Sequence, residues 1–335
     1  MNLATRYLGL DLRNPLVASA SPLSNTVDGV RRLAHAGVGA VVLYSLFEEQ
    51  LRREAAQNAA LADAGTESFA ESLSYFPAGA EGGPGPHRYL SLLERAAAAV
   101  DIPVIASLNG TSPGGWTDCA KALADAGAAA IELNIYHLPA DPMFPGRDVE
   151  QRHVEILTTV KAVVRVPVAV KLSPYFSSTG EMALRLDRAG ADGLVLFNRF
   201  LQPDIDPETL TVTAGFGLSS PAEGRLPRAW IALLAGRVSA SLAATTGVED
   251  AADVARYLLA GADVVMTASA LLRHGVGHAG VLLDGLSGWM ARKGFATVAD
   301  ARGLLAVPAY TNQAAYERAG YVTMMRAADR GDGPW

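Results

Sequence analysis

One phrase recurs four times along the chain and constrains its fold more than any other feature. Each copy follows an amphipathic stretch and places a glycine where a helix would end in a left-handed residue. Each then runs into an apolar, β-rich segment, which is typical of a strand buried on both faces of a parallel sheet. The copies read AGVGAVVL at 36–43, AGAAAIEL at 126–133, AGADGLVL at 189–196 and AGADVVMT at 260–267.

A second phrase alternates with the first, and three of its four copies carry a proline just before or at the start of the strand. Proline lacks an N–H group, so a strand tolerates it best at its first residue. The copies read NPLVASAS at 14–21, IPVIASLNG at 102–110, VPVAVKLSP at 166–174 and RVSASLAAT at 237–245. Interleaving the two phrases predicts strands that start near residues 15, 40, 103, 129, 167, 192, 237 and 263.

Helical patterns fill most of the gaps between these strands, at residues 116–126, 150–164, 181–189 and 249–259. Consecutive β–α units that repeat eight times are typical of a closed parallel barrel. An open doubly wound sheet also alternates strands with helices, but two alternating strand types over the whole series favour the barrel. We therefore expect an α/β chain folded as a (β/α)8 TIM barrel.

Two connections between a strand and the following helix are too long to be plain turns. Residues 47–86 follow the second strand and end in the Gly/Pro-rich AGAEGGPGP, and residues 198–225 follow the sixth strand. Long loops in a compact domain are usually functional or disordered, and barrel enzymes build their active sites from loops at this face. We predict a substrate lid and a side wall. Residues 1–335 are expected to form a single domain, with 295–335 as a C-terminal helical tail.

Composition excludes several classes of protein. The chain is 50% hydrophobic, enough for a large core, and its net charge of -6 argues against nucleic acid or an anionic membrane as a partner. Cys119 is the single cysteine, so this chain holds neither a disulfide framework nor its own iron–sulfur cluster. We expect it to pack as a small apolar residue. Without a signal peptide or an apolar run of membrane-spanning length, the expected location is the cytoplasm.

The C-terminal ends of the predicted strands carry the polar residues. They supply one lysine, three asparagines and several hydroxyl groups, which suit a polar, planar, anionic cofactor better than a divalent metal. Lys171 lies inside the apolar strand VAVKLSP, and a buried lysine is costly unless it is paired or used. It either hydrogen-bonds a flavin ring or forms a Schiff base as in aldolases. The alternative is a lysine whose ammonium reaches the solvent at the rim.

Two hydroxyl-rich segments follow the last two strands. Residues 245–248 (TTGV) precede one helix, and residues 267–269 (TAS) precede another. Barrels often bind phosphate with these two loops, through backbone N–H groups and helix dipoles. Plain N-capping of the helices by hydroxyl side chains is the alternative. We predict a phosphate site at this position.

Three histidines invite a chemical interpretation. His137 follows the fourth strand in ELNIYHLPADP, where it is either a general base or a loop histidine without chemistry, and Tyr136 beside it either stacks on a ring or packs. His274 and His278 have i, i+4 spacing but no third ligand nearby, which argues against zinc. The segment GVGHAG at 275–280 matches G-x-G-x-x-G, but it follows LLRH, which reads as helix, so the dinucleotide-binding context fails.

With these residues the chain resembles the dihydroorotate dehydrogenase family, and its soluble class more than its membrane-associated class, which carries an extra N-terminal helical extension. The resemblance runs from residue 8 to about residue 275. It is carried by NPLVASAS, SLNG at 107–110, ELN at 132–134, VAVKLSPYF at 168–176, ADGLVLFN at 191–198 and AGADVVMTASAL at 260–271.

The resemblance implies FMN at the mouth of the barrel. Asn134 and Lys171 would bind its isoalloxazine and ribityl groups, and the loops after the last two strands would hold its phosphate. In that family the flavin takes a hydride from the dihydropyrimidine while a base removes the adjacent proton. The position of this base is His137 here, where the soluble class has cysteine. The implied cofactor residues are Ala20, Ser21, Ser45, Asn109, Asn134, Lys171, Asn198, Thr246, Gly247, Ala268 and Ser269.

The sequence departs from the family's pattern chiefly on the substrate side. Tyr44 stands where the family has a lysine, and ESLSYFP at 71–77 replaces an asparagine-rich phrase. Thr246 and Ala268 replace two phosphate-site glycines. Arg199 replaces the serine of an Asn-Ser pair; it either recruits a carboxylate or is an ordinary surface arginine. The residues expected to contact substrate are Tyr75, Asn198 and Arg199.

Three functions follow as hypotheses. The first is an FMN-dependent oxidoreductase of pyrimidine biosynthesis that oxidises dihydroorotate, or one that reduces a related planar ring, with His137 and Lys171 in catalysis. The second is a Schiff-base aldolase that uses Lys171. The third is a non-catalytic barrel subunit of a larger redox complex. A small-molecule substrate, a homodimer and a separate electron-transfer partner are expected partners, and no metal is expected.

Overall fold

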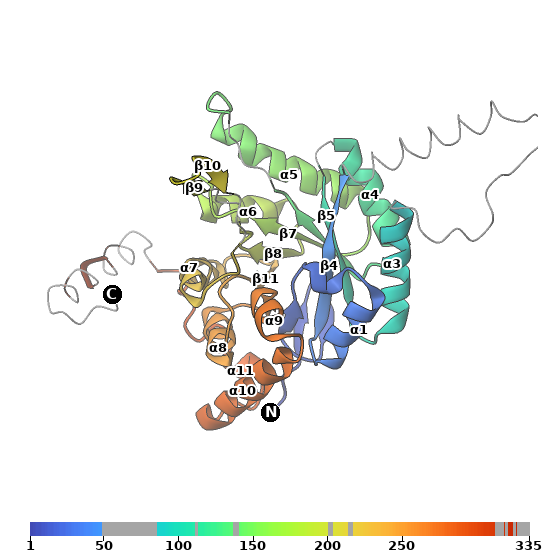
Figure 1. Cartoon of the computed structure of the whole chain (residues 1–335). Coiled ribbons are helices and arrows are strands. Elements are labelled where there is room, and N and C mark those ends of the chain that lie inside the picture. The colour runs from blue at the N-terminus through green and yellow to red at the C-terminus, as the bar shows by residue number, and fades with distance from the viewer. Residues whose placement is uncertain are drawn as a thin grey trace, which may run out of the picture.

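The computed structural model describes residues 1–48, 86–110, 113–136, 141–199, 204–213 and 217–311, with residues 318, 321–323 and 326. Its centre is a closed barrel of parallel strands (Figure 1), which confirms the predicted (β/α)8 TIM barrel. The strands, in order around the barrel, are β3 (Leu16–Ala18), β4 (Ala40–Phe47), β5 (Val104–Asn109), β6 (Ala130–Asn134), β7 (Val168–Leu172), β8 (Gly193–Leu196), β11 (Ser241–Ala244) and β12 (Val264–Thr267).

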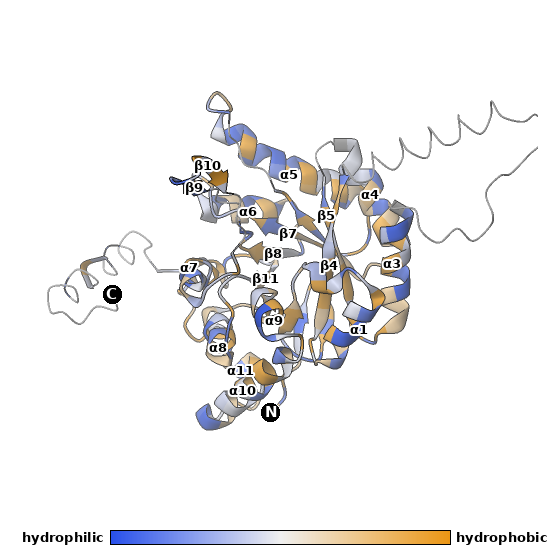
Figure 2. Ribbon diagram, viewed as in Figure 1, coloured by the Kyte–Doolittle hydropathy of each residue, from blue (hydrophilic) through white to orange (hydrophobic). Residues whose placement is uncertain are grey.

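Helices surround this barrel and cover the outer faces of its strands (Figure 1). Figure 2 shows that these helices carry both hydrophilic and hydrophobic residues, as expected for elements with one buried face. The described α-helices are α1 (Val27–His35), α3 (Pro86–Ala99), α4 (Pro113–Asp125), α5 (Gly146–Val163), α6 (Thr179–Arg188), α7 (Arg225–Leu234), α8 (Ala251–Ala260), α9 (Ser269–His274), α10 (His278–Lys293) and α11 (Val298–Ala301). Of these, α9 begins at the mouth of the barrel, and α10 and α11 pack against α8.

The repeated glycines end helices as the sequence predicts. Gly37, Gly127, Gly190 and Gly261 have φ angles of 104°, 89°, 93° and 117°, a left-handed region that side chains with a Cβ rarely adopt. Each glycine is followed within a few residues by a barrel strand. The repeated phrase therefore records a helix end, a tight turn and a buried strand.

One strand begins later than predicted. The phrase at 237–245 predicts a strand from about residue 237, but β11 starts at Ser241. The residues before it form a turn because the N–H groups of Ser239 and Ala240 donate to Asp187 Oδ1, at 2.9 and 2.7 Å, and not to a neighbouring strand. The apolar pattern alone does not reveal this capping by a carboxylate at the end of α6.

The interior of the barrel is filled by small and branched side chains from alternate strand positions, such as Val17, Val195 and Val264. A hairpin of β1 (Thr5–Tyr7) and β2 (Leu10–Leu12) packs against this inner cluster through buried Tyr7, Leu8 and Leu12. Gly193 has room for no side chain, because a Cβ there would lie 2.5 Å from Leu8 Cδ2. The packed interior leaves the opposite, C-terminal face for a ligand.

The two long loops and the tail are described in part. Residues 49–85 of the predicted lid lie outside the described residues. The predicted side wall contains a hairpin of β9 (Asp204–Asp206) and β10 (Thr211–Thr213). Described residues 295–311 of the tail contain α11, and Val307 N beyond it donates to Ala232 O at 2.8 Å. None of the described helices has the length and apolar character needed to span a bilayer.

Candidate active site

A cavity of about 480 Å³ opens at the C-terminal ends of the barrel strands. Its size falls within the roughly 300–1,000 Å³ typical of small-molecule and cofactor pockets. Residues at or just after the ends of all eight strands contribute to its lining, so the closed barrel itself positions the site. The lining includes Ala20, Ser21, Phe47, Asn109, Asn134, Tyr136, Lys171, Asn198, Arg199, Ser219, Thr246, Gly247, Ala268 and Ser269.

The cofactor residues implied by the sequence therefore come together, with Ser45 just behind the lining. Asn134 Nδ2 donates to Ser45 Oγ at 3.2 Å, and Ser45 Oγ lies 2.8 Å from Ser107 Oγ. On the other side, Asn198 Nδ2 donates to Asn134 Oδ1 at 2.6 Å. These hydrogen bonds link β4, β5, β6 and the loop after β8. They fix the orientation of the two asparagine amides at the cavity wall.

Lys171 and Glu132 form a buried ion pair beneath these hydrogen bonds. Lys171 Nζ lies 3.4 Å from Glu132 Oε1, and the two residues are only 7% and 1% exposed. The alternative of a lysine that reaches solvent at the rim is thus wrong. The ammonium lines the cavity, and within the described chain Glu132 is its one partner, so two of its N–H groups remain for a ligand.

Glu132 was not singled out as a functional residue from the sequence. Its Oε2 atom is buried and has no hydrogen-bond partner among the described residues. Burial raises the pKa of Tyr7 well above its usual value, and the nearby Glu132 carboxylate raises it further. Period-two alternation places Glu132 on the same face of β6 as Asn134, which is the signal that points to it.

The loop after β11 has an unusual backbone. Thr246 has a φ of 79°, rare for a residue with a branched side chain, and Gly247 follows with a φ of 69°. Tyr257 donates its hydroxyl to Thr246 O at 2.6 Å, and Thr246 Oγ1 donates to Phe197 O at 3.2 Å. Burial raises the pKa of Tyr257, which keeps this phenol a donor. Strained backbone held by its surroundings is a feature of ligand-binding sites.

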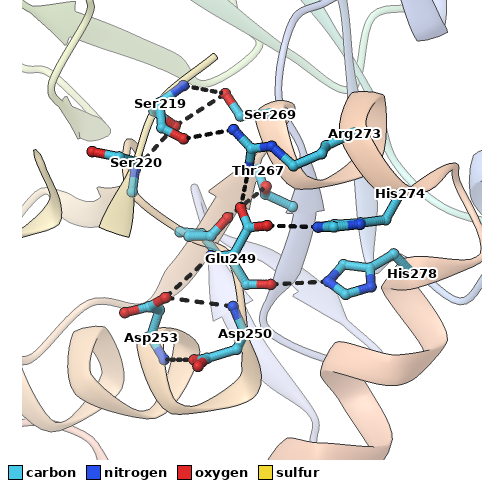
Figure 3. A network of polar contacts seen from close by, with 12 residues as sticks. Ser219, Ser220, Glu249, Asp250, Asp253, Thr267, Ser269, Arg273, His274 and His278 are labelled. Atoms are coloured by element: carbon cyan, nitrogen blue, oxygen red, sulfur yellow. Dashed lines mark hydrogen bonds and ion pairs between the residues drawn. The ribbon is translucent and has the colours of Figure 1, made fainter. Parts of the chain in front are cut away.

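Ser219 joins the two loops for which a phosphate site is predicted. Its N–H and its hydroxyl both donate to Ser269 Oγ at 3.0 Å (Figure 3). Gly247 N donates to Ser219 Oγ at 3.3 Å. Ser219 is 5% exposed and lines the cavity, although the sequence analysis did not select it. The predicted side wall therefore reaches the end of the cavity formed by the loops after β11 and β12.

The wall of the cavity at the ends of β4 and β6 carries aromatic side chains and is described in part. Phe47 and Tyr136 line it, and both are more than one-third exposed. Tyr44 packs against Tyr89 with ring centroids 5.1 Å apart and lines an adjoining hollow with Ser45. His137 and Tyr75, predicted as base and substrate contact, lie outside the described residues.

Arg199 lines the cavity but is already engaged. Its Nη2 lies 3.0 Å from Glu223 Oε1, and a second nitrogen donates to Gly217 O. Partial burial opposes ionisation of Glu223, but the Ser220 N–H and the Arg199 guanidinium together hold the pKa of that carboxyl below its usual value. The guanidinium therefore positions the side wall, and its recruitment of a substrate carboxylate stays a prediction.

The remaining sequence candidates have structural roles. Leu271–Arg273 belong to helix α9, as predicted from the failed G-x-G-x-x-G context. His274 and His278 contact Glu249, and the described residues contain no group of three metal-ligating side chains. Cys119 is buried within α4, where burial first, then Glu48 and Asp118, raise the pKa of its thiol to about 11.

Comparison with known proteins agrees with this geometry. A family model for dihydroorotate dehydrogenase matches residues 2–290. The chain belongs to the dihydroorotate dehydrogenase family. The matched residues cover every strand of the barrel, from the β1–β2 hairpin into α10. The resemblance read from the strand-end phrases is thereby confirmed.

Individual relatives are distant but extend over most of the chain. The dihydroorotate dehydrogenase B (NAD(+)) catalytic subunit of Pyrococcus abyssi is 27% identical over 307 residues, which cover 90% of this chain and 98% of the relative. The protein of the same name from Methanocella arvoryzae is 29% identical over 288 residues, or 85% and 92%. That from Halalkalibacterium halodurans is 34% identical over 179 residues, or 52% and 58%.

Proposed function

We propose that this protein is an FMN-dependent oxidoreductase that moves a hydride between a dihydropyrimidine-type ring and FMN. The observation that carries the proposal is one cavity that joins a buried ammonium, Lys171, to the strained Thr246–Gly247 loop. FMN has a planar ring with hydrogen-bond acceptors at one end and a phosphate at the other. Membership of the dihydroorotate dehydrogenase family supports this assignment, because that family comprises oxidoreductases.

The residues present fit FMN in three parts. Lys171, held by Glu132, and the hydrogen-bonded amides of Asn134 and Asn198 line the cavity and would face the ring and ribityl chain. Gly247 N–H and the hydroxyl of Ser269 lie at the phosphate end. The proposed cofactor residues are those implied by the sequence: Ala20, Ser21, Ser45, Asn109, Asn134, Lys171, Asn198, Thr246, Gly247, Ala268 and Ser269.

Bound FMN would supply a hydride acceptor. We assign proton removal from the adjacent carbon to His137, which directly follows cavity-lining Tyr136, so that loss of the hydride and the proton leaves a carbon–carbon double bond in the substrate ring. Lys171 donates from its ammonium at the ring side of the cavity. Tyr75, Asn198 and Arg199 stay our proposed substrate contacts.

The electron acceptor and the location are part of the same proposal. The relatives are named catalytic subunits of an NAD(+)-dependent enzyme. We propose that this chain likewise passes electrons to a separate protein partner, that it works in the cytoplasm, and that it forms a homodimer. Co-purification from its native source, followed by size measurement, tests these assignments.

Two alternatives are separated by simple experiments. The Schiff-base alternative requires a neutral, nucleophilic amine, whereas Lys171 is ion-paired with Glu132. Borohydride trapping of a substrate adduct on Lys171 would support it, and a yellow purified protein would count against it. A non-catalytic barrel subunit would turn over no substrate, whether or not it bound flavin.

The absorbance spectrum of the purified protein tests the proposal directly. We expect an oxidised flavin spectrum, with about one FMN per chain after denaturation and release. Anaerobic addition of dihydroorotate should bleach it, and His137→Ala should abolish the bleaching while the flavin stays bound. A flavin spectrum that no dihydropyrimidine changes would reject the hydride-transfer part, and a colourless protein that cannot be reconstituted with FMN would reject the whole proposal.

A further inference from the structure

A network of polar contacts joins the segments that follow β8, β11 and β12 (Figure 3). Glu249, just before α8, is contacted by three side chains from the segment after β12. Arg273 Nη1 and His274 Nε2 both reach its carboxylate, the latter at 2.6 Å. His278 Nε2 donates to its backbone carbonyl at 2.9 Å. The carboxylate therefore anchors the guanidinium of Arg273 in one orientation.

The other branch of this guanidinium reaches the side wall. Arg273 Nη2 donates to Ser219 O at 3.2 Å, while the N–H and hydroxyl of the same serine point to Ser269 (Figure 3). One planar cation thus joins the loops that follow β8, β11 and β12. A guanidinium can do this because it presents two donor branches at a fixed angle, which a lysine ammonium on a flexible stem does not.

The start of α8, which carries this anchor, is tied down by contacts of its own. Asp253 is 1% exposed, accepts from the N–H groups of Glu249 and Asp250 at 3.2 and 3.4 Å, and pairs with Arg228 and Arg256. Glu249 keeps its place through its backbone as well as through its side chain. The contacts run from α8 to Arg273 and from Arg273 to Ser219.

We propose that Arg273 is a positioning residue for the phosphate end of the FMN site. Arg273 does not line the cavity; it fixes the peptide of Ser219, whose hydroxyl contacts Gly247 N–H and Ser269, the groups assigned to the phosphate. Without the guanidinium, the Ser219 carbonyl loses this donor, and among the described residues Ser219 is then held by its contacts with Ser269 and Gly247 alone. This inference rests on the proposed function, because it presupposes that FMN occupies the cavity.

Riboflavin separates this role from a general structural one, because it shares the ring and ribityl chain of FMN but lacks the phosphate. The dissociation constants of both flavins are measured by fluorescence titration of the full-length protein after flavin removal. We expect Arg273→Gln to weaken FMN binding by at least about tenfold. Riboflavin binding should stay within about twofold of the wild type, since the contacts of Arg273 with Glu249 and Ser219 share no partner with those of Lys171 and Asn134. Arg273→Lys should restore little, since one ammonium cannot reproduce both contacts.

Arg302→Gln is the matched control. It removes an arginine whose side chain is 45% exposed, against 35% for Arg273, from a pair with Asp263, which lies just before β12 at the opposite end of the barrel. It should change neither constant. Equal weakening of FMN and riboflavin by Arg273→Gln, or no weakening of either, would overturn the positioning role. A wild-type protein that binds neither flavin would instead reject the proposed function and this inference with it.

Discussion

The buried ion pair of Lys171 and Glu132 is a feature of the cavity more than of the fold. Two charges taken out of water gain little net stability, and an apolar pair of similar volume often serves the fold as well. The pair is therefore better explained by the cavity, because Glu132 holds the ammonium at the wall without covering its remaining N–H groups. At this scale, stability and ligand binding can be separated by mutation.

Glu132→Gln leaves the Lys171 ammonium buried without its counter-ion, so we expect the free energy of unfolding to fall by roughly 3 kcal/mol. The double variant Glu132→Leu/Lys171→Met removes both charges and should recover most of that loss, while flavin binding should be abolished. Urea unfolding and flavin titration of the single and double variants measure the two effects. Strictly additive losses of stability would contradict the coupling between the two side chains.

At the level of elements, the loop after β11 depends on a glycine for two reasons. Gly247 has a φ of 69°, and a Cβ on it would lie 2.5 Å from the backbone nitrogen of Gly224. Gly236 has a similar φ of 76° but nothing within 4 Å of the same virtual atom. The two positions therefore separate the cost of a left-handed backbone from the cost of a collision between backbones.

Gly236→Ala should cost about 1 kcal/mol of unfolding free energy, which is the usual penalty for a side chain in the left-handed region. Gly247→Ala should cost clearly more, about 3 kcal/mol, because backbone strain and an overpacked contact add to that penalty. It should also weaken FMN binding, since Gly247 N–H is displaced. Denaturant unfolding of both variants provides the comparison. Equal losses at the two positions would show that the loop after β11 adapts to a side chain.

The elements differ in how far the sequence predicts them. Strand and helix order follow from repeated phrases, because a glycine with positive φ and an apolar strand are local features, as at Gly190 and β8. The contacts of Ser219 with Ser269 join residues 50 positions apart through a long loop, and no local pattern encodes them. Strand alternation could have identified Glu132 as a site residue, because it lies on the same face of β6 as Asn134. It was missed because it stands within an otherwise apolar strand phrase. The late start of β11 depends on the carboxylate of Asp187, which is equally remote in sequence.

At the scale of the whole molecule, closure of the barrel joins the first and last elements of the chain. β12 pairs with β3, and β11 pairs with β8, so no strand of the barrel is an edge. Asn2 N donates to Ala296 O at 2.9 Å, and Val298 N donates to Asn2 O at 3.2 Å. These contacts favour our proposal that residues 1–335 form one domain.

One cooperative unit should unfold in a single calorimetric transition, and that whole transition should move when FMN binds, because the cavity takes residues from every barrel strand. With free FMN at about one hundred times its dissociation constant, the stability gain should be about 2.7 kcal/mol. Riboflavin at the same multiple of its own constant should give the same gain, which controls for occupancy. Two transitions, of which FMN moves only one, would instead show that the halves of the chain unfold separately, and the closed hydrogen-bond ladder would not be the element that makes folding cooperative.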